Sequence, residues 1–162
     1  QSGCGRTPWH FDDHHFPLDT NDVVTAWVPA QPIPLEMGPL SFAYPLDVYK
    51  LVKAVKFEKA STGYDCGVSD VFLKNNVSVN ETPFELGEVS FHHNLNFHTA
   101  SSNRTNRSRV ALANTYYRDG ARVVNAPTMV SGDWQKFMPN VKPGDIAVSP
   151  LNPICWPIKD KS

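Results

Sequence analysis

Proline recurs along much of this sequence and is the residue type that most restricts what the chain can fold into. There are 14 prolines among the 162 residues. Proline lacks a backbone N–H and its ring clashes with the preceding helical turn, so it ends or kinks an α-helix. The intervening segments are rich in valine, threonine and phenylalanine, which favour β-strands. The sequence therefore predicts a mainly β protein with few, short helices.

Length and composition set the broad class. A chain of this length is expected to form one domain, residues 1–162, with a sizeable core. A hydrophobic fraction of 41% and a formal net charge of -1 are typical of a soluble globular domain. The absence of a basic excess argues against a nucleic-acid partner. No apolar run approaches the roughly 20 residues that span a bilayer, which argues against a membrane protein.

The cysteines and glycosylation sequons point in opposite directions on location. Three widely separated cysteines, Cys4, Cys66 and Cys155, do not form a disulfide framework or a zinc knuckle, and they suggest free thiols in a reducing compartment. Sequons begin at Asn76, Asn80, Asn103 and Asn106. Such triplets also arise by chance in loops rich in asparagine, serine and threonine, and no signal-peptide pattern is present. We therefore expect a cytoplasmic location.

Alternating apolar and polar residues between turn signals locate the strands. We expect strands over Pro8–Asp12, Val23–Pro29, Leu40–Tyr44, Glu85–His98 and Arg109–Tyr117, and a short helix over Asp70–Asn75. Ala30–Pro39 is rich in proline and is expected to be a loop.

A His-x-Asp pair near the start carries the strongest chemical signal. On a strand, alternate side chains share a face, so His10 and Asp12 would point to the same side. Two histidines and one carboxylate bind non-haem Fe(II) on one face and leave three coordination positions open. The pattern alone is weak, because the chain has six histidines and the run Asp12–His15 also suits a solvated polar turn.

The third ligand must come from another part of the chain. In the expected strand Glu85–His98, the residues His92, Asn94, Asn96 and His98 share one face. That polar face would either meet solvent or line a polar cavity. His93 has the opposite parity to His98, whereas His92 competes with His98 and would need a different register.

Three segments together resemble the phytanoyl-CoA dioxygenase family of Fe(II)/2-oxoglutarate-dependent oxygenases. They are TPWHFDDHHFPLDTNDVVTAWVPAQPIPLEMGPL (Thr7–Leu40), LGEVSFHHNLNFHTASSNRTNRSRVALANTYY (Leu86–Tyr117), and the end from Lys142 to Pro153. The resemblance implies a double-stranded β-helix, a cupin-like jelly roll of two antiparallel sheets. Residues 46–85 match only loosely, and we interpret them as a variable insertion. Family members carry a helical lead segment before His-x-Asp, which we expect this chain to lack.

The resemblance also implies roles for individual residues. It assigns Fe(II) to His10, Asp12 and His98, and the distal carboxylate of 2-oxoglutarate to Arg109, eleven residues after His98. The planar guanidinium suits this role because it binds a carboxylate bidentately and stays charged. Further contacts to 2-oxoglutarate are implied for Trp27 and Asn96. A core role for Trp27 remains an equal alternative.

The activity that the resemblance implies is hydroxylation of a C–H bond in a small organic molecule. O₂ and 2-oxoglutarate would be consumed, and succinate and CO₂ released. Related halogenases replace the acidic ligand by a small residue, so Asp12 favours hydroxylation. Two alternatives stay open: a non-catalytic relative that binds metal or ligand, and a cupin-like metalloenzyme that does not use 2-oxoglutarate.

Overall fold

The computed structural model describes residues 5–55, 62–127 and 132–156. The chain forms two compact units. The first unit comprises residues 1–11 and 24–115, and the second unit comprises residues 12–23 and 116–162.

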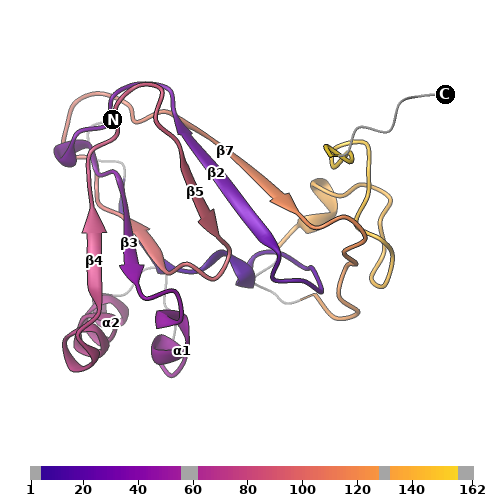
Figure 1. The fold of residues 1–162 in the computed structure, drawn as a ribbon, viewed down its shortest axis with the longest axis horizontal. Coiled ribbons are helices and arrows are strands. Elements are labelled where there is room, and N and C mark those ends of the chain that lie inside the picture. The colour runs from indigo at the N-terminus through magenta and orange to yellow at the C-terminus, as the bar shows by residue number, and fades with distance from the viewer. Residues whose placement is uncertain (1–4, 56–61, 128–131, 157–162) are drawn as a thin grey trace. The chain divides into compact units, whose positions relative to one another are not determined.

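Two sheets of antiparallel strands build most of the first unit (Figure 1). The four-stranded sheet has the order β1-β6-β3-β4. Its strands are β1 (Thr7–His10), β6 (His98–Ala100), β3 (Leu40–Tyr44) and β4 (Ser78–Glu81). The three-stranded sheet has the order β5-β2-β7, with strands β5 (Ser90–His93), β2 (Val23–Pro29) and β7 (Ala111–Tyr117).

The strand bounds confirm some predictions and correct others. Val23–Pro29 and Leu40–Tyr44 are strands as predicted. The prediction that one strand holds both His10 and Asp12 is wrong, because β1 ends at His10 and Asp12 begins the 3₁₀ turn η1 (Asp12–His14). A run of short polar side chains bonds readily to its own backbone and favours a turn over a strand.

The predicted strand Glu85–His98 is also wrong, because the chain passes from one sheet to the other within it. β5 ends at His93 and β6 begins at His98. Between them the Asn96 N–H donates to the His93 carbonyl at 2.8 Å, which closes a turn. The turn breaks the period-2 alternation, so side-chain parity cannot be carried from His92 or His93 to His98.

The first unit also contains a 3₁₀ turn, η2, and two α-helices, α1 and α2. The 3₁₀ turn η2 (Leu35–Met37) interrupts the predicted loop before β3. The helix α1 (Val48–Val52) was not predicted, and α2 (Thr62–Asn75) extends well beyond the predicted Asp70–Asn75. α1 and α2 contact one another below β3 and β4 in Figure 1.

Gly67 explains why α2 is hard to recognise from the sequence and why it is needed. Glycine weakens a helix, so its presence argues against one. In the fold, however, a Cβ at position 67 would lie 2.9 Å from Val55 Cγ1, so glycine permits the close approach of the two segments. The buried or half-buried face of α2 has helical spacing and comprises Tyr64, Val68, Val71 and Phe72.

The apolar core of the first unit centres on Phe97, which is 1% exposed. Trp9 stacks on Phe97 with ring centroids 5.4 Å apart and an interplanar angle of 14°. Phe72 of α2 meets the edge of Trp9 at 5.0 Å. The residue before His10 and the residue before His98 are therefore anchored in the same core.

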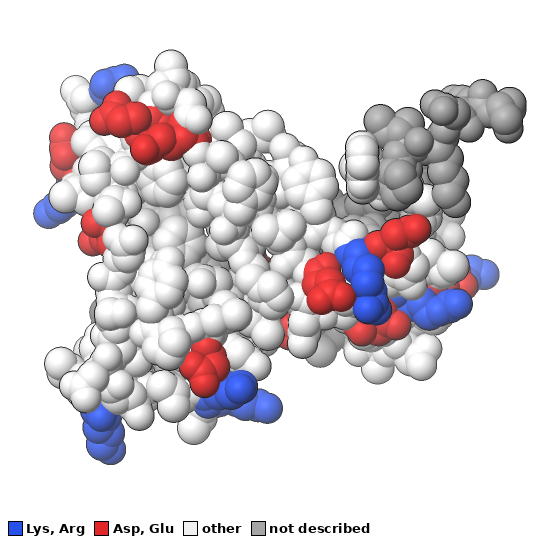
Figure 2. Space-filling view, in the orientation of Figure 1, with Lys and Arg blue, Asp and Glu red and all other residues white. Residues whose placement is uncertain are grey.

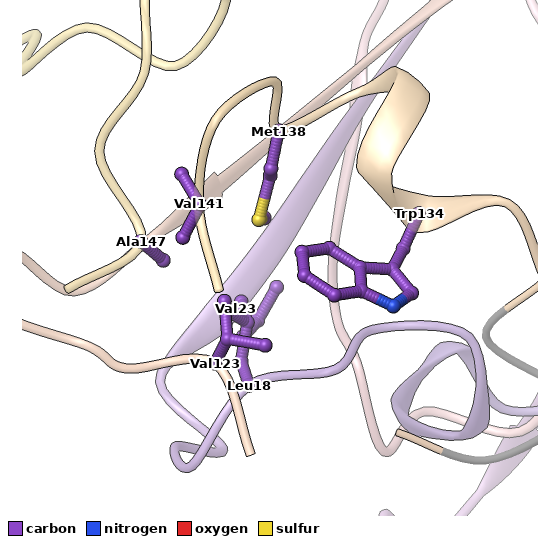
Figure 3. Packing of buried hydrophobic residues seen from close by; sticks show 7 residues of the cluster. All are labelled: Leu18, Val23, Val123, Trp134, Met138, Val141 and Ala147. Atoms are coloured by element: carbon purple, nitrogen blue, oxygen red, sulfur yellow. The ribbon is translucent and has the colours of Figure 1, made fainter. Parts of the chain in front are cut away.

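The second unit has its own core (Figure 3). It is formed by Leu18, Val23, Val123, Trp134, Met138, Val141 and Ala147. Trp134 enters this cluster from the 3₁₀ turn η4 (Trp134–Lys136). Figure 3 shows its indole ring beside Met138.

The charges on the surface and the lengths of the helices are relevant to binding of nucleic acids and membranes. On the face drawn in Figure 2, lysine and arginine are interspersed with aspartate and glutamate rather than gathered into a basic patch. Within the described ranges, no helix combines the length and the apolar character that a membrane span requires.

Candidate metal centre

His10 and His98 face one another across β1 and β6. The register pairs Thr7 with Ala100 and His10 with His98, so three steps on β1 oppose two on β6. Such a bulge re-aims the side chains of the strand that carries it. The two imidazole rings lie with centroids 4.2 Å apart.

Both imidazoles are oriented by the same local hydrogen bond. Nδ1 of His10 lies 2.8 Å from the Pro8 carbonyl, and Nδ1 of His98 lies 2.9 Å from the Asn96 carbonyl. A carbonyl oxygen only accepts, so each Nδ1 carries the proton and donates it. The unprotonated nitrogen is then Nε2, and this pattern of orientation is typical of metal-binding histidines.

Asp12 completes a group of three possible ligands. One ligand atom from each of His10, Asp12 and His98 lies within 4.8 Å of the other two. His98 is 5% exposed, and the other two side chains are half-buried. Although Asp12 is on a turn and not on β1, it follows His10 by two residues and still reaches the same place. The donor set of two imidazoles and one carboxylate fits a ferrous ion with open positions.

The competing histidines occupy other environments. His92 is buried beside His98, with ring centroids 4.8 Å apart and with Ser90 Oγ 3.4 Å from its Nδ1. Its ring contacts that of His98 from the other sheet at a tilt of 50°, but His92 does not belong to the group of three. His93 Nδ1 accepts the Leu95 N–H at 3.1 Å in the turn between β5 and β6.

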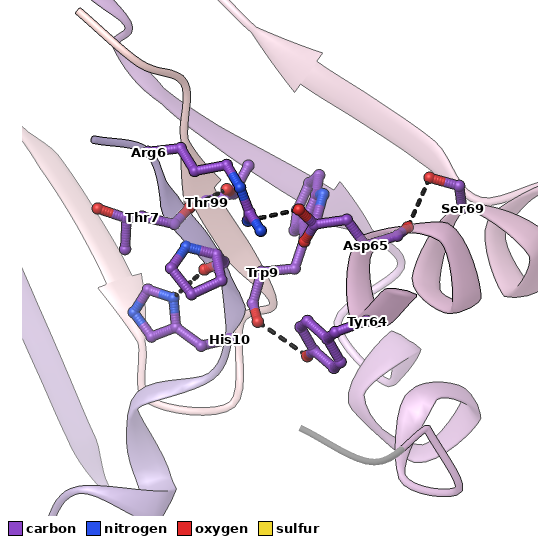
Figure 4. A network of polar contacts seen from close by, with 9 residues as sticks. Arg6, Thr7, Trp9, His10, Tyr64, Asp65, Ser69 and Thr99 are labelled. Carbon is purple, nitrogen blue, oxygen red and sulfur yellow. Dashed lines mark hydrogen bonds and ion pairs between the residues drawn. The ribbon is translucent and has the colours of Figure 1, made fainter. Parts of the chain in front are cut away.

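The segment predicted to be a variable insertion supports the strand that carries His10 (Figure 4). The Tyr64 hydroxyl of α2 donates to the Trp9 carbonyl at 2.8 Å. Arg6 forms an ion pair with Asp65 of the same helix. On the other side of β1, the Thr99 hydroxyl donates to the Thr7 carbonyl at 2.5 Å. Nothing in the sequence signalled Tyr64, because α2 itself was largely unrecognised.

Tyr64 gives a pH-dependent prediction. Burial, and then the neighbouring Asp65 carboxylate, raise the pKa of Tyr64 from 10.0 to about 12. The neutral phenol is thus favoured in the folded protein, and the stability that it contributes is present below pH 10 and is lost as pH rises toward 12. We expect Tyr64→Phe to lower the free energy of unfolding by about 1 kcal/mol at pH 8 through the lost hydrogen bond.

Between pH 10 and 12, Tyr64→Phe should lose stability less steeply than the wild type. Urea unfolding followed by tryptophan fluorescence at several pH values measures both effects. Tyr44→Phe, at an exposed position of β3, is the matched control. Parallel pH dependence in wild type and Tyr64→Phe would refute the role given to this hydroxyl.

Arg109 lies just before β7, and its guanidinium reaches the loops around β3 and β6. Its Nη1 donates to the carbonyls of Met37 and Ser101 at 3.3 Å each, and also to the carbonyl of Gly38. Ser101 follows His98 by three residues, which is on the order of 10 Å of extended chain. The structure therefore holds the guanidinium at the end of the strand that bears His98.

The loop before Arg109 is organised by Asn103. This side chain is 5% exposed, and its Nδ2 donates to the Arg107 carbonyl at 2.7 Å. Its Oδ1 accepts from both the N–H and the hydroxyl of Thr105, at 2.9 and 2.7 Å. Asn103 begins a sequon in the sequence, and its burial gives it a structural part in the loop.

The sequence also predicted that Trp27 and Asn96 contact 2-oxoglutarate, and the structure bears on these two roles only indirectly. Trp27 packs edge-on against Phe84 at 5.0 Å, in the apolar cluster that also includes Ile33 and Met37. Asn96 contributes its carbonyl to His98, and its side-chain Oδ1 is buried without a hydrogen bond to the described residues. An unsatisfied buried acceptor of this kind, two residues from a possible ligand, fits a site that receives a further polar group.

Solved structures with a similar fold include two enzymes from nogalamycin biosynthesis. The non-heme alpha ketoglutarate dependent carbocyclase SnoK has a TM-score of 0.68 and 23% identity, over 92% of this chain and 55% of its own. The non-heme alpha ketoglutarate dependent epimerase SnoN has a TM-score of 0.65 and 20% identity, over 92% and 54%. SnoN has also been solved with Fe3+, alpha ketoglutarate and nogalamycin RO.

This likeness confirms the predicted double-stranded β-helix, and the chain spans about half the length of these two enzymes. A search of curated proteins finds no match. The family model for phytanoyl-CoA dioxygenase (PhyH) matches residues 1–111, which include both His-x-Asp and Arg109. The chain belongs to the phytanoyl-CoA dioxygenase family.

Proposed function

We propose that this chain contains the metal-binding core of an Fe(II)- and 2-oxoglutarate-dependent oxygenase that acts on a small organic molecule. The observation that carries the proposal is the group His10, Asp12 and His98, in which both imidazoles are held with Nδ1 protonated. Membership of the phytanoyl-CoA dioxygenase family supports the choice of iron and 2-oxoglutarate.

In this proposal the chain's own residues bind and orient. His10 and His98 ligate through Nε2, and the Asp12 carboxylate is the third ligand. The rings of Phe42 and His92 lie against His98, at centroid distances of 5.9 and 4.8 Å, and restrict its rotation. Bound Fe(II), together with 2-oxoglutarate, supplies the O₂ activation that amino-acid side chains lack.

Arg109 is proposed to hold the distal carboxylate of 2-oxoglutarate. Its Nη1 donates hydrogen bonds to three backbone carbonyls, and these bonds fix the plane of the guanidinium. The guanidinium has five donors, so Nε and Nη2 can pair with a carboxylate in the usual fork geometry. Trp27 and Asn96 are proposed to lie beside this co-substrate.

The reaction we propose is hydroxylation, in which a substrate C–H, O₂ and 2-oxoglutarate give C–OH, succinate and CO₂. Asp12 supports it, because this position holds a carboxylate rather than a small residue that would make room for halide. The similar structures are described as a carbocyclase and an epimerase, so the fold accommodates other outcomes. A product heavier by one oxygen atom distinguishes hydroxylation from both. A cytoplasmic location is part of the same proposal.

Succinate formation tests the function without knowledge of the substrate. Purified protein with Fe(II), O₂ and 2-oxoglutarate should release succinate slowly, and Asp12→Ala should not. His15→Ala, at an exposed position three residues away, is the matched control and should retain the wild-type rate. Iron binding without succinate would favour the non-catalytic alternative, and metal-dependent activity without 2-oxoglutarate would favour the cupin-like one.

A further inference from the structure

Two consecutive residues after β2 hold the backbone on both sides of Arg109. The Ala30 N–H donates to the Val110 carbonyl at 3.0 Å. The Gln31 side-chain Nε2 donates to the Ser108 carbonyl at 2.9 Å. The carbonyl groups of the residues before and after Arg109 are thus each hydrogen-bonded to the same short segment, 77 or more residues earlier in the chain.

The same Gln31 amide also reaches the loop that receives the guanidinium. Its Nε2 lies 3.2 Å from Met37 Sδ. Met37 is 1% exposed, and its carbonyl accepts one of the Nη1 hydrogen bonds of Arg109. One side-chain amide therefore connects the backbone that carries Arg109 to the residue that accepts from its guanidinium.

Gly38 lies close to both Ser101 and the Arg109 guanidinium. Its φ of +73° is in the left-handed region that favours glycine. A Cβ at this position would clash with the Ser101 carbonyl and would lie 3.0 Å from Arg109 Nη1. The guanidinium thus lies close against the backbone of Gly38, where a side chain would crowd it.

The remaining donors of Arg109 are those that a ligand would use. All of its hydrogen bonds to the described part of the chain come from Nη1. Nε and Nη2 are then the nitrogens whose direction determines where a carboxylate binds. Because the fork is planar and rigid, fixing Nη1 and the backbone also fixes the direction of Nε and Nη2.

We propose that Gln31 is a positioning residue for Arg109 and thereby sets the affinity for the distal carboxylate of 2-oxoglutarate. This inference rests on the proposed function. The side-chain hydrogen bonds of Gln31 in the described structure go to Met37 and Ser108 and not to the three possible metal ligands, so its effect should be confined to the co-substrate. Loss of one neutral hydrogen-bonding group should lower the affinity for 2-oxoglutarate about fivefold to tenfold and leave the affinity for Fe(II) unchanged.

The test compares Gln31→Leu, which keeps a side chain of similar size but has no donor, with Gln135→Ala as an exposed control in η4. Anaerobic calorimetry gives the dissociation constants of Fe(II), and then of 2-oxoglutarate, for each protein. In metal-free samples, the ¹⁵N heteronuclear NOE of the Arg109 Nε–Hε group, assigned through Arg109→Lys, reports directly on the order of the guanidinium.

The expected result is weaker 2-oxoglutarate binding and a lower NOE in Gln31→Leu only. If wild type binds 2-oxoglutarate and Gln31→Leu binds it equally well, or if the NOE is unchanged, the positioning role is wrong and the proposed function stands. If wild type binds Fe(II) but no 2-oxoglutarate, the proposed function fails and the positioning role falls with it.

Discussion

Replacing His98 by alanine is expected to abolish iron binding while the protein remains folded. His98 is the most buried of the three possible ligands, and its Nδ1–H is fixed by the Asn96 carbonyl. Loss of an outer partner of a metal-binding histidine already costs 10–100-fold in metal affinity, so loss of the ligand itself should cost at least about 100-fold. Anaerobic Fe(II) titration measures the affinity, and thermal unfolding checks the fold.

The neighbouring histidines make this prediction specific. His92→Ala removes a buried ring whose centroid is 4.8 Å from that of His98 but which is outside the group of three. This substitution should lower the affinity for iron only a few-fold. His93→Ala, which alters the turn before β6, should behave like His92→Ala. Strong iron binding by His98→Ala together with loss in His92→Ala would show that the ligand set is wrongly assigned.

Replacing Arg109 by alanine is expected to have the opposite pattern: iron is retained and 2-oxoglutarate is lost. Removal of one partner of a hydrogen-bonded charge pair costs about 2–5 kcal/mol, which corresponds to a dissociation constant at least about 30-fold higher. The variant should also unfold more easily, because the carbonyls of Met37, Gly38 and Ser101 lose their shared donor. Calorimetry with Fe(II)-loaded protein measures the first effect.

Two other arginine variants separate charge from geometry. Arg109→Lys keeps the charge but has no planar fork, so it should recover only part of the affinity. Arg107→Ala, at an exposed position in the same loop, should bind 2-oxoglutarate as wild type does. Normal binding by Arg109→Ala would leave this arginine with a structural role alone and would favour a metalloenzyme that does not use 2-oxoglutarate.

The fold was predictable from the sequence because its motifs resemble a known family, more than because each strand could be read. β2 and β3 follow simple alternation and were predicted with their observed bounds. The region Glu85–His98 shows the limit of that reasoning, since its alternating pattern runs unbroken through a turn. Only the passage between sheets, closed by Asn96 and His93, reveals two strands.

The candidate ligands were predictable, but the reason given for one of them was incomplete. Strand alternation suggested a shared face for His10 and Asp12, whereas the structure brings them together through a strand bulge and a 3₁₀ turn. Because His10 and Asp12 are only two residues apart in the chain, they can reach the same place without lying on one strand. The placement of the distant candidate ligand, His98, depends instead on the pairing of β1 with β6, which no local pattern encodes.

The supporting contacts could not have been predicted. Gln31 and Ser108 are far apart in sequence and have ordinary loop composition, yet a single amide joins them. Tyr64 lies in a segment that matches the family loosely, and only the packing of α2 against β1 gives its hydroxyl a partner at Trp9. Such contacts depend on tertiary placement, so their residue types carry no signal in the sequence.

The most direct test of the central claim is an anaerobic titration of the purified chain, first with Fe(II) and then with 2-oxoglutarate, followed by visible absorption. We predict a charge-transfer band that appears only when both are present and that is missing in His98→Ala. Such a band would establish the metal, the co-substrate and the distant ligand together. Iron binding without the band, or a band that persists in His98→Ala, would contradict the account.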